Sequence, residues 1–122
     1  MPDTEPAEAL RDVMDRWRAG IDAHEPQRVA ALFTDDAIFQ GLRPYSVGPQ
    51  GVYEYYDSQP SGMTVAYRIL ESRRLSGEVL LGYLRADFSY PDGPVIGVHI
   101  GVLIRRTSEG WRIGYYQASR GD

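Results

Sequence analysis

Three polar side chains in the last third of the chain could carry chemistry. Tyr115 and Gln117 alternate along a predicted strand, so both face the same side of a sheet, where a phenol and an amide could polarise the carbonyl of a bound molecule. His99 offers an imidazole that could serve as a base near neutral pH. The predicted register places it on the opposite face, where a structural role is the alternative. Tyr115, Gln117 and His99 are therefore the candidate catalytic residues.

Aromatic side chains suggest a binding site, since nine tyrosines are many for 122 residues. Buried tyrosine hydroxyls need hydrogen-bond partners, which a ligand or water in an aromatic-lined cavity would supply. The alternative is that these rings are simply core. Arg43, in a loop, could meet a carboxylate or phenolate at the cavity mouth, or could be solvated. The candidate ligand-binding residues are Trp17, Phe39, Arg43, Tyr45, Tyr56, Tyr67, Phe88, Tyr115 and Gln117, and Tyr53 is expected in the same cone.

Metal and cofactor chemistry has little support in this sequence. The absence of cysteine excludes disulfides, thiolate chemistry and cysteine zinc sites, and His24 and His99 are the only histidines. There is no glycine-rich phosphate loop and no metal-ligand spacing, so we expect neither a cofactor nor a metal. Asp35 and Asp36 resemble a catalytic acid pair, but such a pair more often caps a turn that enters a strand.

The charge and hydropathy pattern excludes several partners. A net charge of −4 and a pI of about 5.1 leave no basic footprint for nucleic acid. No apolar run approaches the ~18 residues of a membrane span. The N-terminus, Met1–Glu5, is acidic and lacks the apolar core of a signal peptide. We expect a cytoplasmic protein with no nucleic acid or membrane partner.

The periodicity predicts an α+β fold in one domain, residues 1–122. Residues 5–24, 26–33 and 49–58 are predicted helices, the first because apolar residues from Leu10 to Ile21 recur at helical spacing. A short strand is predicted at 37–40. The loop at 41–48 is predicted to gate the cavity, with Tyr45 covering its opening. The period then changes to two, which predicts strands near 63–75, 78–90, 94–106 and 111–119, joined as hairpins.

Pairing these strands about their turns assigns the two faces of the sheet. One face is nearly all apolar and must be covered by the helices; it holds Val65, Tyr67, Ile69, Leu84, Ala86, Phe88, Val98, Ile100, Val102, Ile104, Ile113, Tyr115, Gln117 and Ser119. The other mixes apolar, aromatic and charged side chains, which is typical of a subunit interface and predicts a homodimer; it holds Arg68, Leu70, Tyr83, Arg85, Asp87, His99, Leu103 and Tyr116. A one-residue slip at the last hairpin, through a bulge at Gly110, would change this grouping.

Two motifs give the chain a family resemblance. The order of elements, the step Leu32-Phe33-Thr34-Asp35-Asp36-Ala37 and the ending Gly110-Trp111-Arg112-Ile113 resemble the nuclear transport factor 2-like superfamily over nearly the whole chain. Within it, the sequence looks most like the SnoaL-like and SgcJ/EcaC-type bacterial proteins. The resemblance implies three helices packed on a strongly curved antiparallel sheet, a cone-like or cystatin-like roll, which hosts both enzymes and binding proteins.

The same resemblance argues against one known activity of the fold. Ketosteroid isomerases, which are similar in fold, use a tyrosine, a base aspartate and a protonated aspartate. The corresponding positions here are Trp17, Gly41 and the Gly101–Val102 pair, so all three functional groups are missing.

The combined hypothesis is a small-molecule-binding protein of bacterial secondary metabolism or catabolism. If it is an enzyme, we expect a cyclase- or isomerase-type reaction in the aromatic-lined cavity. Its ligand would be a small hydrophobic or aromatic organic molecule. The alternative is a non-catalytic dimeric accessory or interaction protein whose core is filled.

Overall fold

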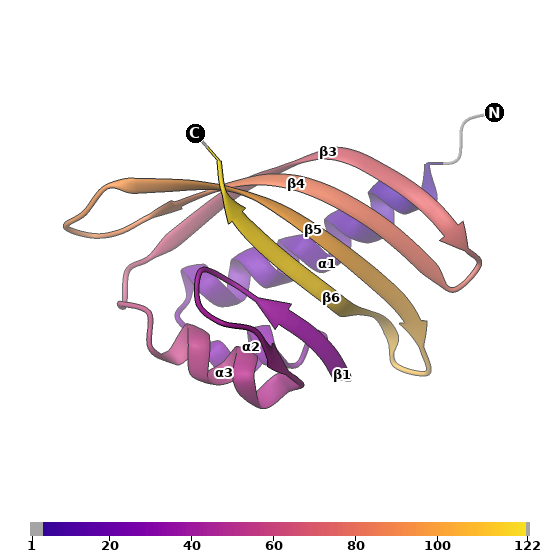
Figure 1. Cartoon of the computed structure of the whole chain (residues 1–122), viewed down its shortest axis with the longest axis horizontal. Coiled ribbons are helices and arrows are strands. Elements are labelled where there is room, and N and C mark those ends of the chain that lie inside the picture. The colour runs from indigo at the N-terminus through magenta and orange to yellow at the C-terminus, as the bar shows by residue number, and fades with distance from the viewer. Residues whose placement is uncertain (1–3, 122) are drawn as a thin grey trace.

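The computed structural model describes residues 4–121 and consists of helices packed against one curled, six-stranded sheet (Figure 1). The first three residues, part of the acidic N-terminus considered above, lie outside the described residues. The elements are α1 (Glu5–Asp22), α2 (Pro26–Ala30), β1 (Phe33–Gln40), β2 (Ser46–Val47), α3 (Pro49–Asp57), β3 (Thr64–Ser76), β4 (Val79–Ser89), β5 (Val95–Thr107) and β6 (Gly110–Arg120). The predicted α+β class is confirmed.

Helix α1 forms where the apolar spacing predicts it and buries one face. Leu10, Met14 and Trp17 are fully buried, and α1 packs mainly on β3, with further contacts to α2 and β4. Thr4 occupies the N-cap position without a side-chain capping bond. The helix ends two residues earlier than predicted, because His24 turns the chain with a positive φ of 51° just before Pro26 opens α2.

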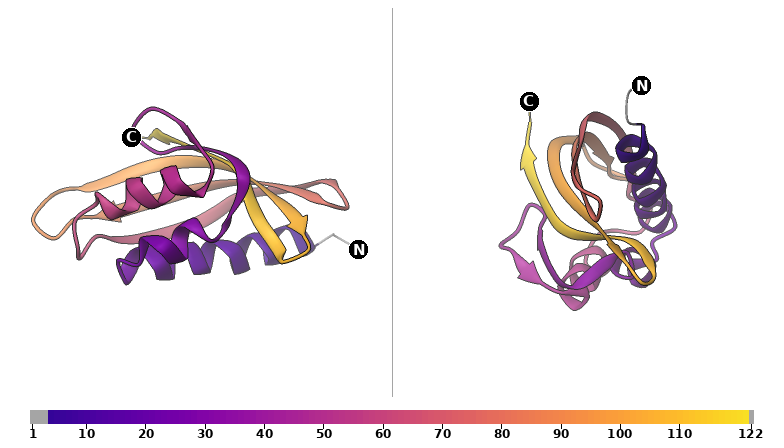
Figure 2. Two further views of the ribbon diagram at one scale, coloured as in Figure 1. Left: turned by 90° about the horizontal axis from the view of Figure 1, so that it is seen from below. Right: turned by 90° about the vertical axis from the view of Figure 1, so that its right-hand side faces the viewer.

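The strand order is β2-β1-β6-β5-β4-β3, so the sheet is mixed, not purely antiparallel as predicted. The last four strands form the expected antiparallel meander, whereas β1 pairs parallel with β6. Strand β2 lies inside the segment predicted as a loop, where Ile38 pairs with Val47. The sheet curls around the helices without closing, which leaves its other face uncovered (Figure 2).

A bulge in β6 shifts the register that the sequence predicted for the last strand. Leu103 pairs with Tyr115 but the next residue, Ile104, pairs with Ile113, so Gly114 is the extra residue. Beyond it, every side chain of β6 changes face. Tyr116 and Ala118 are buried, whereas Tyr115 and Gln117 lie on the uncovered face. Ser119 also lies on the uncovered face, as the partner of His99. The predicted placement of Tyr115, Tyr116, Gln117 and Ser119 is therefore wrong, and the slip occurs at Gly114 and not at Gly110.

The side chain of Arg105 explains why the bulge forms at a glycine. A Cβ added at Gly114 would lie 2.8 Å from Nε of Arg105, because that side chain crosses β6 at this point. It donates to Thr34 Oγ1 at 2.9 Å and pairs with Asp36. These contacts join β5 to the part of β1 between Phe33 and Ile38, where the register between β1 and β6 shifts.

Candidate functional site

The predicted aromatic cone exists, but its own side chains fill it. Trp17, Phe39 and Tyr56 are buried, as is Tyr116, which the predicted register had excluded. The ring of Tyr116 lies 4.9 Å from that of Phe39 and 6.1 Å from that of Trp17. Such ring separations are those of packed aromatic pairs. No large open cavity therefore lies at the centre of the described sheet.

Two further aromatic candidates, Tyr67 and Phe88, flank this cluster. The ring of Phe88 lies 5.9 Å from that of Trp17, and the ring of Tyr67 lies 6.2 Å from it on the side of α1. Tyr67 is half-buried and its hydroxyl donates to Asp15 at 2.6 Å, so this phenol already has a partner. Phe88 lines the cone, whereas Tyr67 belongs to the contact between α1 and β3.

Three buried side chains form a hydrogen-bond network inside the cone. The indole N–H of Trp17 donates to the Tyr56 hydroxyl at 3.1 Å, and the hydroxyls of Tyr56 and Tyr116 lie 3.5 Å apart. The network holds three donor hydrogens, one on the indole and one on each phenol, but only two hydrogen bonds. Whichever phenol donates to the other, one hydroxyl hydrogen has no acceptor among residues 4–121.

Burial keeps both phenols neutral. Desolvation raises the pKa of Tyr116 well above its ordinary value, and raises that of Tyr56 in the same direction, since a phenolate would have no water around it. Both hydroxyls are therefore protonated over the physiological pH range and act as hydrogen-bond donors. The spare donor can serve a neutral acceptor such as a carbonyl or hydroxyl oxygen.

A small void adjoins this network at the mouth of the cone. Its volume of about 10 Å³ is close to the room that one water needs. Tyr116, Phe88, Val98 and Ala118 line it from the sheet, Tyr55, Gln59 and Met63 from α3 and the segment after it, Gly41 and Leu42 from the loop after β1, and Tyr90 from the end of β4.

Tyr55 closes this mouth, a residue that the sequence analysis did not select. Its hydroxyl accepts a hydrogen bond from the backbone N–H of Leu42 at 3.2 Å, and its ring packs edge-on against Phe39 at 5.2 Å. A Cβ on Gly41 would lie 2.5 to 2.7 Å from the tip of the phenol. Gly41 therefore leaves the space that this side chain occupies.

The loop candidates lie at the mouth, but not as expected. Arg43 is exposed, with its guanidinium 5.8 Å from the centre of the Tyr55 ring and a hydrogen bond to Ser58 Oγ at 3.2 Å. Tyr45 is 66% exposed and does not line the void, so the expectation that it covers the opening is wrong. Its neighbours pair as β2, which directs this ring away from the cone.

The three candidate catalytic residues all lie on the uncovered face. Tyr115 donates to Gln117 at 2.5 Å, and His99 stacks on Tyr83 with ring centres 5.6 Å apart. The predicted position of His99 is confirmed, whereas the other two were expected inside. None of the three contacts the aromatic cone, so the structure brings no base to it from these positions.

The acid pair has a structural setting. Asp36 accepts from Thr34 at 2.9 Å and pairs with Arg105, and these contacts lower the pKa of its carboxyl. Asp35 is exposed. Within residues 4–121 no three His, Asp or Glu side chains are placed to hold a metal ion, and no helix is long and apolar enough to span a membrane.

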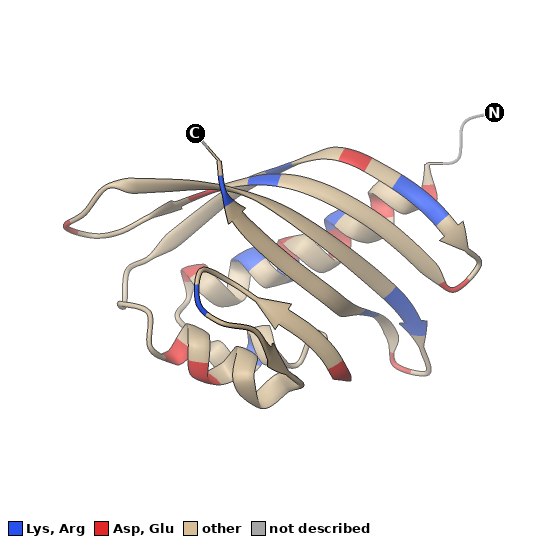
Figure 3. Ribbon diagram, viewed as in Figure 1, with Lys and Arg blue, Asp and Glu red and all other residues tan. Residues whose placement is uncertain are grey.

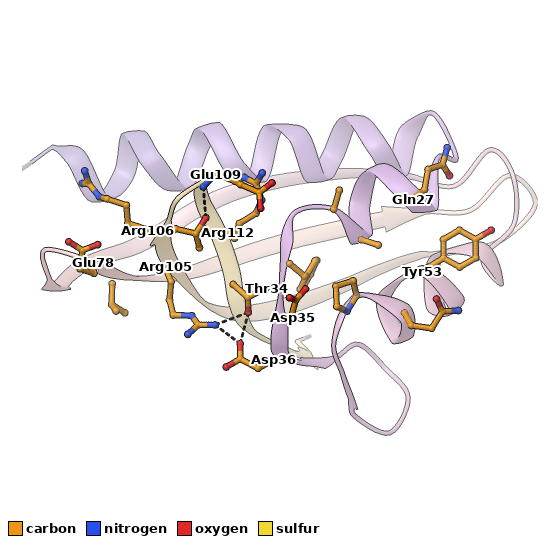
Figure 4. Close-up of a pocket in the computed structure, with 17 residues that line it drawn as sticks. Gln27, Thr34, Asp35, Asp36, Tyr53, Glu78, Arg105, Arg106, Glu109 and Arg112 are labelled. Atoms are coloured by element: carbon orange, nitrogen blue, oxygen red, sulfur yellow. Dashed lines mark hydrogen bonds and ion pairs between the residues drawn. The ribbon is translucent and has the colours of Figure 1, made fainter.

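An open groove of about 850 Å³ shares no lining residue with the void at the cone mouth (Figure 4). It runs from α2 and α3 across the start of β1 to the β5–β6 turn. None of the nine candidate ligand-binding residues lines it, but Tyr53, expected in the cone, does. This groove and the aromatic cone are thus separate sites.

Comparison with solved structures identifies the fold. The chain matches a domain of unknown function with a cystatin-like fold from Nostoc punctiforme (TM-score 0.84, 15% identity, 99% of this chain and 80% of that one). It also matches a ketosteroid isomerase-like protein from Erwinia carotovora atroseptica, with a TM-score of 0.76 and 21% identity over 98% of this chain and 99% of that one. A third match is a candidate scytalone dehydratase from Novosphingobium aromaticivorans, with a TM-score of 0.78 and 13% identity over 95% of this chain and 84% of that one. No protein-family model and no curated protein matches the sequence.

At these identities the likeness shows the fold alone, which is the nuclear transport factor 2-like, or cystatin-like, fold that the sequence motifs indicated. The structure also locates the positions that the resemblance assigns to the acid and the base of the isomerases. Gly41 lies at the cone mouth, Val102 is buried and Gly101 faces open space, so none of them supplies an acid or base.

Proposed function

We propose that the chain binds a small, mostly apolar organic molecule in the aromatic cone and holds its single oxygen acceptor with the Tyr56–Tyr116 pair. The observation that carries this proposal is the hydroxyl hydrogen without an acceptor beside a void at the cone mouth. A buried polar hydrogen without a partner is costly, and a ligand oxygen would satisfy it.

Entry requires Tyr55 to move. This side chain lines the void from α3 and packs on Phe39, and the void of about 10 Å³ is too small for a ring. The remaining walls, among them Phe88, Met63 and Val98, are apolar. A flat molecule with one carbonyl or hydroxyl group fits this combination of walls and donor.

The site favours binding and polarisation over proton abstraction. No charged side chain is buried among the described residues, and the lining of the void contains no carboxylate or imidazole. Neutral phenols can stabilise developing negative charge on a ligand oxygen, which is how donors assist enolisation or cyclisation. Any reaction in this cone would depend on that donation and on a base that the ligand or solvent supplies.

The test compares a ligand with its acceptor-free analogue. 1-Indanone carries one carbonyl, and indane has nearly the same shape without it. Since a net hydrogen bond contributes about 1.4 kcal/mol, Tyr116→Phe should weaken 1-indanone about tenfold and leave indane unchanged. Tyr115→Phe removes the neighbouring hydroxyl from the other face of β6 and should change neither affinity.

Titration followed by the amide signals of β6 and α3 measures both affinities. Equal weakening of 1-indanone and indane by Tyr116→Phe would contradict the donor role. An effect of Tyr115→Phe on 1-indanone would contradict the placement of the site inside the cone.

A second candidate function rests on a different observation, the continuous row of side chains across the uncovered face. Cross-strand partners place Val47, Ile38, Tyr115, Leu103 and Leu81 in one line over five strands. Ile38 is 44% exposed and Val47 59%. Apart from the strand ends, β5 and β6 carry no charge along this face (Figure 3).

We propose that this face joins two copies of the chain. A row of apolar side chains flanked by Tyr83, His99 and Arg85 has the composition of a subunit interface, with an apolar centre and a polar rim. A dimer is compatible with ligand binding in the cone, and the filled cone would in addition allow a dimeric accessory protein without a ligand.

A further inference from the structure

The open groove on the far side of β1 has an arrangement of charge that the proposed function does not use. Arg105 and Arg112 are direct partners in the antiparallel β5–β6 pair, so both side chains leave the same face of the sheet. Their guanidinium groups then diverge, because Arg105 crosses β6 at Gly114 towards Asp36, whereas Arg112 turns back to the carbonyl of Trp111 (Figure 4). Two like charges directly opposite each other destabilise a sheet unless something neutralises them. The contacts of each guanidinium show how far its charge is neutralised.

Arg105 is only partly neutralised. One terminal nitrogen donates hydrogen bonds to both Thr34 and Asp36 (Figure 4). The Nε of Arg105 is buried and has no acceptor among the described residues. Its other terminal nitrogen has no partner in the same part of the chain.

Arg112 is not neutralised by any described carboxylate. Its one hydrogen bond runs from a terminal nitrogen to the backbone carbonyl of the adjacent Trp111, at 3.1 Å. Within residues 4–121 it makes no ion pair, although the neighbouring Arg106 pairs with Glu5 and lies over the Trp111 ring. Most of the five N–H donors of this guanidinium therefore remain available at the side of the groove.

Negative side chains also line the groove, but they are more exposed than the two arginines. Arg105 and Arg112 extend from strands and are half-buried, whereas the four carboxylates are exposed; these belong to Asp35, Asp36, Glu78 and Glu109. Water screens the exposed carboxylates more than it screens the half-buried guanidiniums. The floor thus favours one anionic group, and the acidic rim disfavours a polyanion.

Apolar surface lies next to the two arginines. Ala30 and Ala31 of α2, Pro49 of α3, Phe33 of β1 and Val79 of β4 line the same groove of about 850 Å³. We propose that this groove is a second binding site, which takes a small organic acid with its carboxylate on Arg112 and its apolar part along α2 and α3, while the charge of Arg105 adds to the attraction. A guanidinium fork binds a carboxylate in bidentate geometry, which suits the available donors of Arg112.

The probe for this site is benzoate, with benzyl alcohol as its neutral analogue and inorganic phosphate as an anion without apolar surface. Benzoate should bind saturably, shift the amide signals of residues 33–36 and 105–112, and weaken as sodium chloride is added. Arg112→Gln should weaken it about tenfold or more, since a charge-assisted hydrogen bond is lost. Arg120→Gln, a matched change at the other end of β6, should not.

Each alternative result has a defined meaning. Equal binding of benzyl alcohol, or unchanged benzoate binding in Arg112→Gln, would overturn the acid site. Phosphate as tight as benzoate would overturn the apolar part of the proposal. Loss of benzoate in Tyr116→Phe but not in Arg112→Gln would place the acid in the cone, so the groove proposal would fail while the proposed function stood.

Discussion

Replacing Gly41 with alanine should open the mouth of the cone. The added Cβ would lie 2.5 to 2.7 Å from the tip of the Tyr55 phenol, closer than atoms can approach. The obstructed atoms are the far end of a side chain, so the ring is expected to swing outward while the backbone stays in place. Gly41 does not have a positive φ, and alanine can therefore adopt its backbone conformation.

The cost follows from the contacts that Tyr55 loses. Its ring packs edge-on against Phe39 at 5.2 Å and against Tyr56 at 5.0 Å, and each such pair contributes about 0.5 to 1.5 kcal/mol. The hydrogen bond from Leu42 adds about 1 kcal/mol. The sum is roughly 2 to 4 kcal/mol, from which the lower entropy of the unfolded alanine chain subtracts up to about 1 kcal/mol.

Urea denaturation of Gly41→Ala and Gly77→Ala measures this difference. An added Cβ at Gly77 meets no atom within 4 Å, so that variant carries the entropy effect alone. Gly41→Ala should be less stable than Gly77→Ala and should bind 1-indanone with a faster association rate. Equal stability of the two variants, with an unchanged rate, would refute the role of Tyr55 as the closing side chain.

Two further predictions concern the uncovered face and the buried phenols. Tyr83→Glu should convert the dimer to a monomer in sedimentation velocity, because it puts a charge into the proposed interface beside His99; an unchanged dimer mass would exclude that face. Burial raises the pKa of Tyr56 and Tyr116 in the folded protein above the value near 10 that they have in the unfolded chain. Above pH 10 the unfolded chain therefore loses protons that the folded protein keeps. The free energy of unfolding is unaffected by these groups below pH 10 and falls above it by about 1.4 kcal/mol per pH unit for each phenol. Tyr116→Phe should therefore show a shallower loss of urea resistance between pH 10 and 11.5, and an identical loss would mean that Tyr116 is not buried.

The sequence predicted the elements because their periodicities are strong and local. Leu10, Met14 and Trp17 recur at helical spacing, and the long strands alternate between apolar and polar residues. The parallel pairing of β1 with β6 was not predicted, since it joins residues more than seventy positions apart, such as Phe39 and Tyr116. Nothing in the local pattern of either strand specifies that partner.

The site was predicted less well because it depends on one inserted residue. The bulge at Gly114 exchanges Tyr115 for Tyr116 at the cone, and two adjacent tyrosines gave no reason to prefer either. Arg105 could have indicated the bulge, since its guanidinium needs a path across β6 that only a glycine leaves open. Tyr55 was missed because its role depends on the space above Gly41, which is a tertiary contact.

A structure of the protein with 1-indanone bound is the most direct test of the central claim, that the Tyr56–Tyr116 pair holds a ligand oxygen inside the cone. We expect the ketone oxygen within hydrogen-bond distance of the Tyr116 hydroxyl, with the Tyr55 ring displaced from its place above Gly41. A ketone bound elsewhere on the molecule, with Tyr55 still hydrogen-bonded to Leu42, would contradict it.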